Sequence, residues 1–194
     1  MDEWPVQCFK AYDIRGLSNG NGTGELTPKF AYRLGSAMAT YLGCDAFAVG
    51  RDIRDSSPAL TRELMRGLVE GGVEVHDLGI VSTGCVYHAC WTLPVDGGVM
   101  VTASHLPMPT HNGFKMCKGT LPLAGEEIQE LKDVFLKGIQ IRRRSNSRCA
   151  SLGHLHRCDY GIDGINCSSS QGRRRLWQRC TRTCHVHVAR QDGC

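Results

Sequence analysis

Residues 46–78 read AFAVGRDIRDSSPALTRELMRGLVEGGVEVHDL and decide the fold class. They open with a short apolar run at 46–49, which is typical of a buried strand. Ser57-Pro58 then has the form of a helix N-cap followed by the first helical position. Three leucines at four-residue spacing form the apolar face of the helix: Leu60, Leu64 and Leu68. Gly71-Gly72 ends that helix and a second strand follows at 73–78, so the segment predicts a strand, a helix and a strand.

The same alternation extends to both sides of this unit. We expect strands at 8–14, 97–101 and 114–117, and helices after Thr27-Pro28, at 82–93 and from Glu126-Glu127 onward. Alternating strands and helices predict a three-layer α/β domain, in which helices cover both faces of a mostly parallel mixed sheet. Ligands of such sheets bind beyond the carboxyl ends of the strands, which directs attention to loops 13–16, 50–57 and 102–113.

Charge divides the chain of 194 residues into two unlike parts, although the whole carries a net charge of +4. Residues 1–138 hold 12 Lys and Arg against 16 Asp and Glu, whereas 139–194 hold 11 Arg against 3 Asp and no Lys or Glu. We therefore predict a domain at 1–138 and a poorly ordered basic tail at 139–194. The composition of the tail is typical of translation in a wrong reading frame, and a genuine basic tail is the alternative.

Composition also excludes several classes of protein. No stretch approaches the ~20 apolar residues that span a bilayer, and the first ten residues, MDEWPVQCFK, lack the form of a secretory signal. The 11 cysteines are scattered and odd in number. Those before residue 138 fall mostly on apolar faces, as small buried hydrophobes do in a reducing compartment. We expect a cytoplasmic protein without a membrane partner.

The tail contains two further patterns. Cys180-x3-Cys184-His185-x-His187 holds zinc-type ligands, but its spacing does not match a zinc finger. The arginine runs at 142–144 and 173–175 could neutralise nucleic-acid phosphates. Aromatic residues are not interleaved with them, so we do not expect a nucleic-acid partner.

The segment Thr102-Ala103-Ser104-His105 directly follows the apolar strand at 97–101. Its small residues allow a sharp turn, which would let the Ser104 hydroxyl project from the edge of the sheet. His105 is adjacent, and Asn112-Gly113-Phe114-Lys115 brings the chain back with a cation. A hydroxyl beside a base and cations suits phosphoryl transfer, in which the protein positions groups and neutralises charge. An ordinary polar loop is the alternative.

Arginines mark the two other loops. Arg15 lies at the end of the first strand, and Arg51 and Arg54 precede a helix N-terminus. Arginine forms bidentate contacts with phosphate, and a helix start adds backbone donors. The alternative is that Arg51 and Arg54 pair with nearby aspartates and only hold the loops, which we favour for Arg51 more than for Arg15.

Four segments in this order, FKAYDIRG, GRDIRDSSP, VMVTASHLP and NGFK, resemble the N-terminal domain of the α-D-phosphohexomutases, over about residues 8–137. In this superfamily of phosphomannomutases and phosphoglucomutases, a phosphoserine passes its phosphoryl group to a hexose monophosphate. The resulting bisphosphate returns the other group, which isomerises 1- and 6-phosphates. The resemblance implies mannose or glucose phosphates and hexose 1,6-bisphosphate as ligands and Mg²⁺ as cofactor.

Carried over by position, the resemblance makes Ser104 the phosphoserine nucleophile and, through its phosphate, a metal ligand. His105 and Lys115 would be catalytic, assisting proton transfer and holding the phosphate. Four residues would line the phosphate-binding site: Tyr12, Arg15, Asn112 and Gly113. Arg51 and Asp52 look like organisers of their loop.

The sequence also departs from the family pattern. Leu106-Pro107 follows the histidine, which tilts the expected sugar toward mannose, and 108–111 are one residue longer than usual, which could displace Lys115 from Ser104. Thr83-Gly84 replaces a Thr-Pro pair. The family's aspartate cluster and sugar-recognition loop do not follow Gly138, so we expect this chain alone to lack mutase activity. A non-catalytic module that binds sugar phosphates, or nucleic acid through the tail, is the alternative function.

Overall fold

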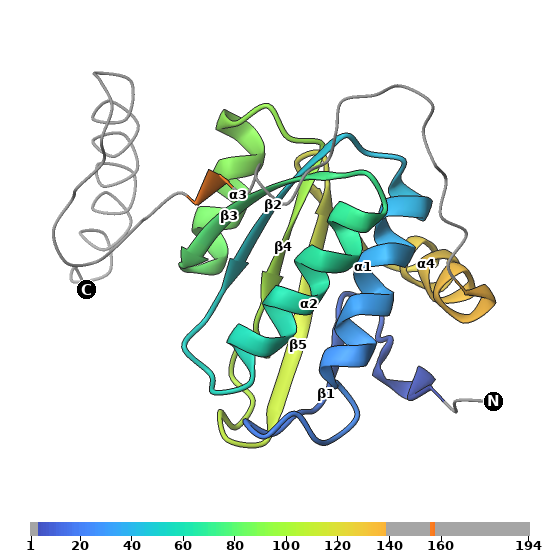
Figure 1. Ribbon diagram of the computed structural model, residues 1–194, viewed down its shortest axis with the longest axis vertical. Helices are drawn as coiled ribbons and strands as arrows, with labels where there is room; N and C mark the ends of the chain where they lie inside the picture. Colours follow the sequence, from blue (N-terminus) through green and yellow to red (C-terminus); the bar gives the residue numbers. More distant parts are fainter. Residues whose placement is uncertain (1–3, 139–155, 158–194) are drawn as a thin grey trace, which may run out of the picture. The chain divides into compact units, whose positions relative to one another are not determined.

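The computed structural model describes residues 4–138 and 156–157 of the chain. Its helices are α1 (Pro28–Leu42), α2 (Ser57–Glu70), α3 (Thr83–Thr92) and α4 (Glu126–Lys137), preceded by a 3-10 helix at Val6–Cys8. Its strands are β1 (Ile14–Leu17), β2 (Ala46–Arg51), β3 (Glu74–Ile80), β4 (Gly97–Val101), β5 (His111–Lys118), β6 (Leu121–Pro122) and β7 (His156–Arg157). They form one sheet in the order β1-β5-β4-β2-β3-β7, and β6 pairs with β5 (Figure 1).

Strand direction brings two of the predicted loops, 50–57 and 102–113, to one edge of this sheet. The loop predicted at 13–16 is wrong, because residues 14–16 belong to β1. β2 runs parallel to β3 and β4, whereas β5 is antiparallel to both β4 and β1. The carboxyl ends of β1, β2 and β4 therefore meet the amino end of β5 at the same edge. The loops after β2 and β4 and the start of β5 are thus neighbours in space, as a ligand site at the carboxyl ends of strands requires.

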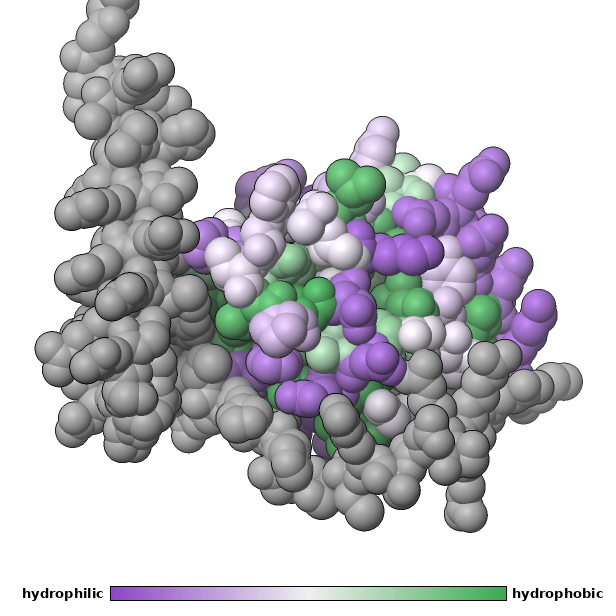
Figure 2. Space-filling model, turned by 90° about the horizontal axis from the view of Figure 1, so that it is seen from above, coloured by the Kyte–Doolittle hydropathy of each residue, from purple (hydrophilic) through white to green (hydrophobic). Residues whose placement is uncertain are grey.

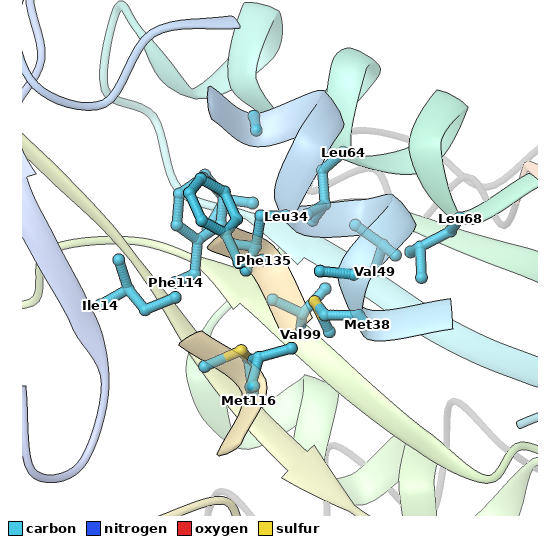
Figure 3. Packing of buried hydrophobic residues seen from close by; sticks show 14 of the residues in the cluster. Ile14, Leu34, Met38, Val49, Leu64, Leu68, Val99, Phe114, Met116 and Phe135 are labelled. Carbon is cyan, nitrogen blue, oxygen red and sulfur yellow. The ribbon is translucent and has the colours of Figure 1, made fainter. Parts of the chain in front are cut away.

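Alternation along the strands builds a core on each face of the sheet. In β4, Val99 and Val101 belong to the larger buried cluster, which α1, α2 and α4 cover, and Met100 belongs to the smaller cluster under α3. Figure 3 shows the larger cluster, in which Leu34 and Phe135 lie over the strands. The predicted α/β class, with a mixed sheet and helices on both faces, is confirmed.

Capping signals predict the start of α1 correctly but not that of α2. The Thr27 hydroxyl accepts a hydrogen bond from the backbone N–H of Phe30 at 3.2 Å, and Gly43 ends α1 in the left-handed region at φ 59°. For α2, the predicted cap at Ser57 is wrong. Ser57 is already the first residue of the helix, and its hydroxyl donates to the Asp52 carboxylate at 2.5 Å instead.

The strand predicted at residues 8–14 is also wrong. Cys8 ends the 3-10 helix, Phe9 forms an isolated bridge to Ile14, and the strand proper begins only at Ile14. The N–H of Lys10 donates to the carbonyl of Asp13 at 2.9 Å, so residues 10–13 form a turn that interrupts any continuous strand. This turn presents Tyr12 and Asp13 at the start of β1.

Two glycines let α1 and α2 cross closely. A Cβ atom on Gly35 would lie 2.1 Å from the carbonyl oxygen of Leu64, and one on Gly67 would lie 2.1 Å from that of Tyr32. No real contact is that short, so glycine is required at both positions. This crossing packs α1 closely against α2, which in turn packs on β2, the strand whose carboxyl end leads into the site.

Within the residues that the structure covers, no helix has the length and apolar character to cross a membrane. Hydrophilic and hydrophobic side chains are interspersed on the face of the domain seen in Figure 2. The predicted tail, apart from β7, lies outside the described residues, so the boundary at 138 stays a prediction. The zinc-type ligands and arginine runs of the tail lie outside them as well.

Candidate active site

The loop after β4 turns sharply at Ser104. The N–H of Thr102 continues the sheet by donating to the carbonyl of Gly113 at 2.9 Å, and the N–H of Ser104 donates to the Thr102 hydroxyl at 3.0 Å. Ser104 has φ 59°, and no other non-glycine residue of the described chain has a positive φ. This left-handed conformation is strained for a side chain with a Cβ atom. Ser104 is exposed, so the strained turn presents its side chain to solvent.

Arg54 holds this loop through hydrogen bonds to its backbone carbonyl groups. Its Nη2 donates to the carbonyl oxygens of Ser104 at 2.7 Å and Leu106 at 2.9 Å. Its Nη1 donates to those of Pro107 and His111, both at 3.1 Å, and its Nε donates to Asp52 at 2.8 Å. All five donors of the guanidinium are therefore used within the protein, and the residue is only 3% exposed.

Of the two alternatives that the sequence left open for Arg54, the structure shows the pairing with aspartate that fixes the loop. Arg54 also does more than this alternative requires, because it holds the loop that carries Ser104 as well as its own loop. Arg51 makes a long contact, 3.4 Å, from Nη1 to the carbonyl of Asp52.

Asp52 anchors the other end of Arg54. Its carboxylate accepts hydrogen bonds from the N–H of Arg54 at 3.1 Å and the hydroxyl of Ser57 at 2.5 Å. Burial opposes ionisation of Asp52, but hydrogen bonds from Ser57, Thr102 and Arg54 outweigh it and hold its pKa below the ordinary value. A charged Asp52 thus neutralises the buried guanidinium.

Asn112 and Gly113, at the start of β5, are packed closely against neighbouring parts of the protein. The buried amide of Asn112 donates to the hydroxyls of Ser56 at 2.8 Å and Ser57 at 2.9 Å, which ties β5 to the start of α2. A Cβ atom on Gly113 would lie 2.5 Å from the carbonyl oxygen of Ile14. Both residues are buried, and their direct contact with phosphate stays a prediction.

Arg15 and Lys115 are brought together by one carboxylate. Asp13 Oδ2 accepts from Arg15 Nε at 2.7 Å and lies 2.6 Å from Arg15 Nη2 and 3.3 Å from Lys115 Nζ. Asp13 is buried, whereas about a quarter of each cationic side chain is exposed. The three charges leave a net positive group that a phosphate can approach. The residues predicted for the site do not include Asp13, although its place two residues before Arg15, on the same side of the chain, was an available signal.

A cavity of about 530 Å³ adjoins this charged group. It is lined by Lys10, Ala11, Tyr12, Asp13, Arg15, Gly16, Glu25, Leu106 and His111. The cavity thus contains the predicted residues Tyr12 and Arg15, and Leu106 brings the serine loop to its wall. Ser104, His105 and Lys115 are not among the lining residues. His105 is exposed beside Ser104.

Oxygen ligands for a metal are few in this part of the chain. Among the residues described, no cluster of three or more His, Cys, Asp or Glu side chains could hold an ion. The carboxylates nearest the site, Asp13 and Asp52, are occupied by arginines. The described residues therefore do not form a complete Mg²⁺ site.

Comparison with known proteins agrees with this geometry. The model of the family "Phosphoglucomutase/phosphomannomutase, alpha/beta/alpha domain I" matches residues 6–142. A phosphomannomutase of Vibrio cholerae is 41% identical over 149 residues, which are 69% of this chain and 31% of that protein. A phosphomannomutase/phosphoglucomutase of Pseudomonas aeruginosa is 37% identical over 158 residues, which are 80% of this chain and 31% of that protein.

A solved structure gives the same result. A phosphoglucomutase/phosphomannomutase family protein of Burkholderia thailandensis superposes with a TM-score of 0.63 at 36% identity, over 70% of this chain and 31% of that one. The chain thus spans less than a third of the length of these relatives. The match to the domain model, the ordered motifs and the superposed fold identify this chain as a member of the phosphoglucomutase/phosphomannomutase family, of which it contains domain I.

Proposed function

We propose that this chain carries the phosphoryl-transferring serine of a phosphohexose mutase, with Ser104 as the nucleophile. The observation that carries the proposal is the strained, exposed turn at Ser104, which Arg54 fixes after β4, while the adjacent strand β5 carries Lys115 of the Arg15–Asp13–Lys115 group. A fixed hydroxyl together with fixed cations suits a reaction that depends on positioning and on neutralisation of charge.

In the proposed step, a hydroxyl of the hexose monophosphate attacks the phosphorus atom of phosphorylated Ser104. The bond from phosphorus to Ser104 Oγ breaks as the new bond to the sugar oxygen forms. The proton of the attacking hydroxyl passes to Ser104 Oγ, which leaves as a hydroxyl and can then accept the other phosphoryl group of the bisphosphate in the reverse step. His105, exposed beside Ser104, assists proton transfer, and Arg15 and Lys115 hold phosphate oxygens.

Tyr12 would line the sugar side of this site, because it belongs to the wall of the cavity that contains Arg15. The ligands are mannose or glucose 1- and 6-phosphates and hexose 1,6-bisphosphate, with mannose favoured by the His105-Leu106-Pro107 sequence. The phosphate on Ser104 would be one ligand of Mg²⁺, which neutralises the charge of a transferring phosphoryl group. Six oxygen ligands are usual for this ion, so the remainder must come from outside the described residues.

Phosphoryl transfer to the full chain tests the proposal. The chain is incubated with ³²P-labelled glucose or mannose 1,6-bisphosphate and Mg²⁺, digested, and mapped for labelled peptides. We expect label on Ser104 in the wild type and none in Ser104→Ala. Label confined to another serine, such as Ser56 or Ser82, would overturn the assignment of the nucleophile.

The same samples distinguish the alternative function. If calorimetry detects binding of hexose phosphates but Ser104 never acquires label, the chain is a sugar-phosphate binding module and not a phosphoryl carrier. We also expect no interconversion of hexose 1- and 6-phosphates by this chain alone. Detection of that interconversion would contradict our expectation that residues beyond this domain are needed for turnover.

A further inference from the structure

Two buried thiols meet on the face of the sheet that α3 covers. The Sγ atoms of Cys90, on α3, and Cys117, on β5, lie 3.3 Å apart. The two residues are 7% and 2% exposed, respectively, and neither belongs to the proposed site of phosphoryl transfer. They are 27 positions apart in the sequence, so only the fold brings them together.

A glycine makes this contact possible. Gly98 on β4 lies opposite Cys117 in the β4–β5 register, and α3 crosses β4 above it. A Cβ atom on Gly98 would lie 2.8 Å from Cys90 Sγ and 2.9 Å from a methyl group of Val86. The missing side chain therefore leaves the space through which Cys90 reaches over β4 to Cys117.

The two thiols differ in pKa and in exposure because their surroundings differ. A hydrogen bond from the Cys117 thiol lowers the pKa of Cys90, because it stabilises the Cys90 thiolate, and outweighs the opposing effect of burial. The same hydrogen bond and burial raise the pKa of Cys117. Cys90 is also the more exposed of the two, so it is the better nucleophile toward a small reagent. Cys8 differs, since burial raises its pKa to about 12.

We propose that Cys90 and Cys117 are a redox pair that hydrogen peroxide converts into a disulfide between α3 and β5. The Cys90 thiolate attacks one peroxide oxygen, the O–O bond breaks, and Cys90 becomes a sulfenic acid as hydroxide leaves and takes up a proton. The sulfur of Cys117 then attacks the Cys90 sulfur and releases the sulfenic oxygen as water, which carries the Cys117 proton. Two thiols and one peroxide thus give one disulfide and two waters.

The geometry allows this product. The two sulfur atoms lie 3.3 Å apart, so they must approach each other by about 1.25 Å to reach the disulfide bond length of about 2.05 Å. The bond would tether α3 to β5 across β4. Because Lys115 lies two residues before Cys117 on the same face of β5, the tether would join α3 to the strand that carries a proposed phosphate ligand.

Peptide mapping of the full chain tests the proposal. The reduced chain is treated with dilute hydrogen peroxide, remaining thiols are blocked with N-ethylmaleimide under denaturing conditions, and the chain is digested without reductant. Trypsin together with chymotrypsin separates Cys85 from Cys90, because Tyr87 lies between them. We expect a Cys90–Cys117 linked peptide lighter by about 2 Da than its two thiol components, which dithiothreitol separates again.

Matched variants sharpen the result. Cys85→Ser, on the same helix, should leave the linked peptide unchanged, and Cys90→Ser should abolish it. In Cys117→Ser the sulfenic acid on Cys90 cannot condense with its partner, so dimedone should label Cys90. If a variant does not fold, the wild-type map still decides. Recovery of Cys90 and Cys117 as maleimide adducts while Cys85 is oxidised, or linkage of either residue to another cysteine, would overturn the proposal.

Discussion

Replacing Arg54 with methionine tests whether this residue organises the serine loop. The change removes a guanidinium with a 2% exposed side chain and five hydrogen bonds, one to Asp52 and four to carbonyl oxygens. Breaking a buried ion pair costs about 3–5 kcal/mol. Asp52 is 20% exposed and the carbonyls of Ser104 and Pro107 lie in an exposed loop, so water can replace part of what is lost. We therefore expect the unfolding free energy to fall by about 3 kcal/mol.

Urea unfolding of the full chain, followed by circular dichroism, measures this loss. Arg54→Lys keeps the charge but has three donors and no planar fork, so it should lose about half as much as the methionine variant. Arg62→Lys is the matched control, because the Arg62 side chain is 72% exposed and its contact with Glu63, from Nε to Oε1, is long at 3.6 Å. The control should change the unfolding free energy by less than about 0.5 kcal/mol.

A second measurement separates loop order from global stability. Limited proteolysis without urea should cleave the loop at 104–110 faster in Arg54→Lys and in Arg54→Met than in the wild type. If Arg54→Met unfolds within about 0.5 kcal/mol of the wild type, and its loop is cleaved no faster, the buried guanidinium does not hold the loop and the reasoning fails.

Three further predictions concern strain, close packing and acid stability. Ser104→Gly should raise the unfolding free energy by up to about 1 kcal/mol, because glycine accepts φ 59° without strain, while Ser104→Ala should not. Equal stability of the two variants in urea would argue against strain at this turn. Gly67→Ala should lose about 1–3 kcal/mol, since its Cβ would lie 2.1 Å from the carbonyl of Tyr32. Gly84→Ala, whose nearest contact is 3.7 Å away, should lose nothing in the same assay. Asp52 has a lowered pKa, so its stabilisation is present above the ordinary value of 3.8 and is lost as the pH falls through the folded-state pKa. Asp52→Asn should therefore show a shallower loss of stability below pH 3.8, and an unchanged pH profile would contradict this.

Capping residues and apolar runs predicted correctly those helices and strands whose limits are set by neighbouring residues in the sequence. Thr27-Pro28 located the start of α1, and the apolar run at 97–101 located β4. The same kind of signal failed where a different hydrogen bond, from a side chain or from the backbone, formed instead. Serine is typical of the N-cap position, but the Ser57 hydroxyl donates a hydrogen bond to the Asp52 carboxylate instead. Cys8 and Phe9 look like the start of a strand, but the turn formed by Lys10 and Asp13 interrupts it.

The amino-acid sequence by itself determined the α/β class and the family, and it singled out Ser104 as the proposed nucleophile, because periodicity, turn residues and ordered motifs are properties of short segments. Only the tertiary structure decided which polar groups serve that hydroxyl. Arg54 reaches a carbonyl 50 residues away, and Asp13 joins a lysine 102 residues away. Strand order and loop packing determine which groups become partners, because a buried charge is stable only when the fold places an opposite charge or hydrogen-bond partner beside it. The spacing of residues within one segment therefore cannot predict these long-range pairs.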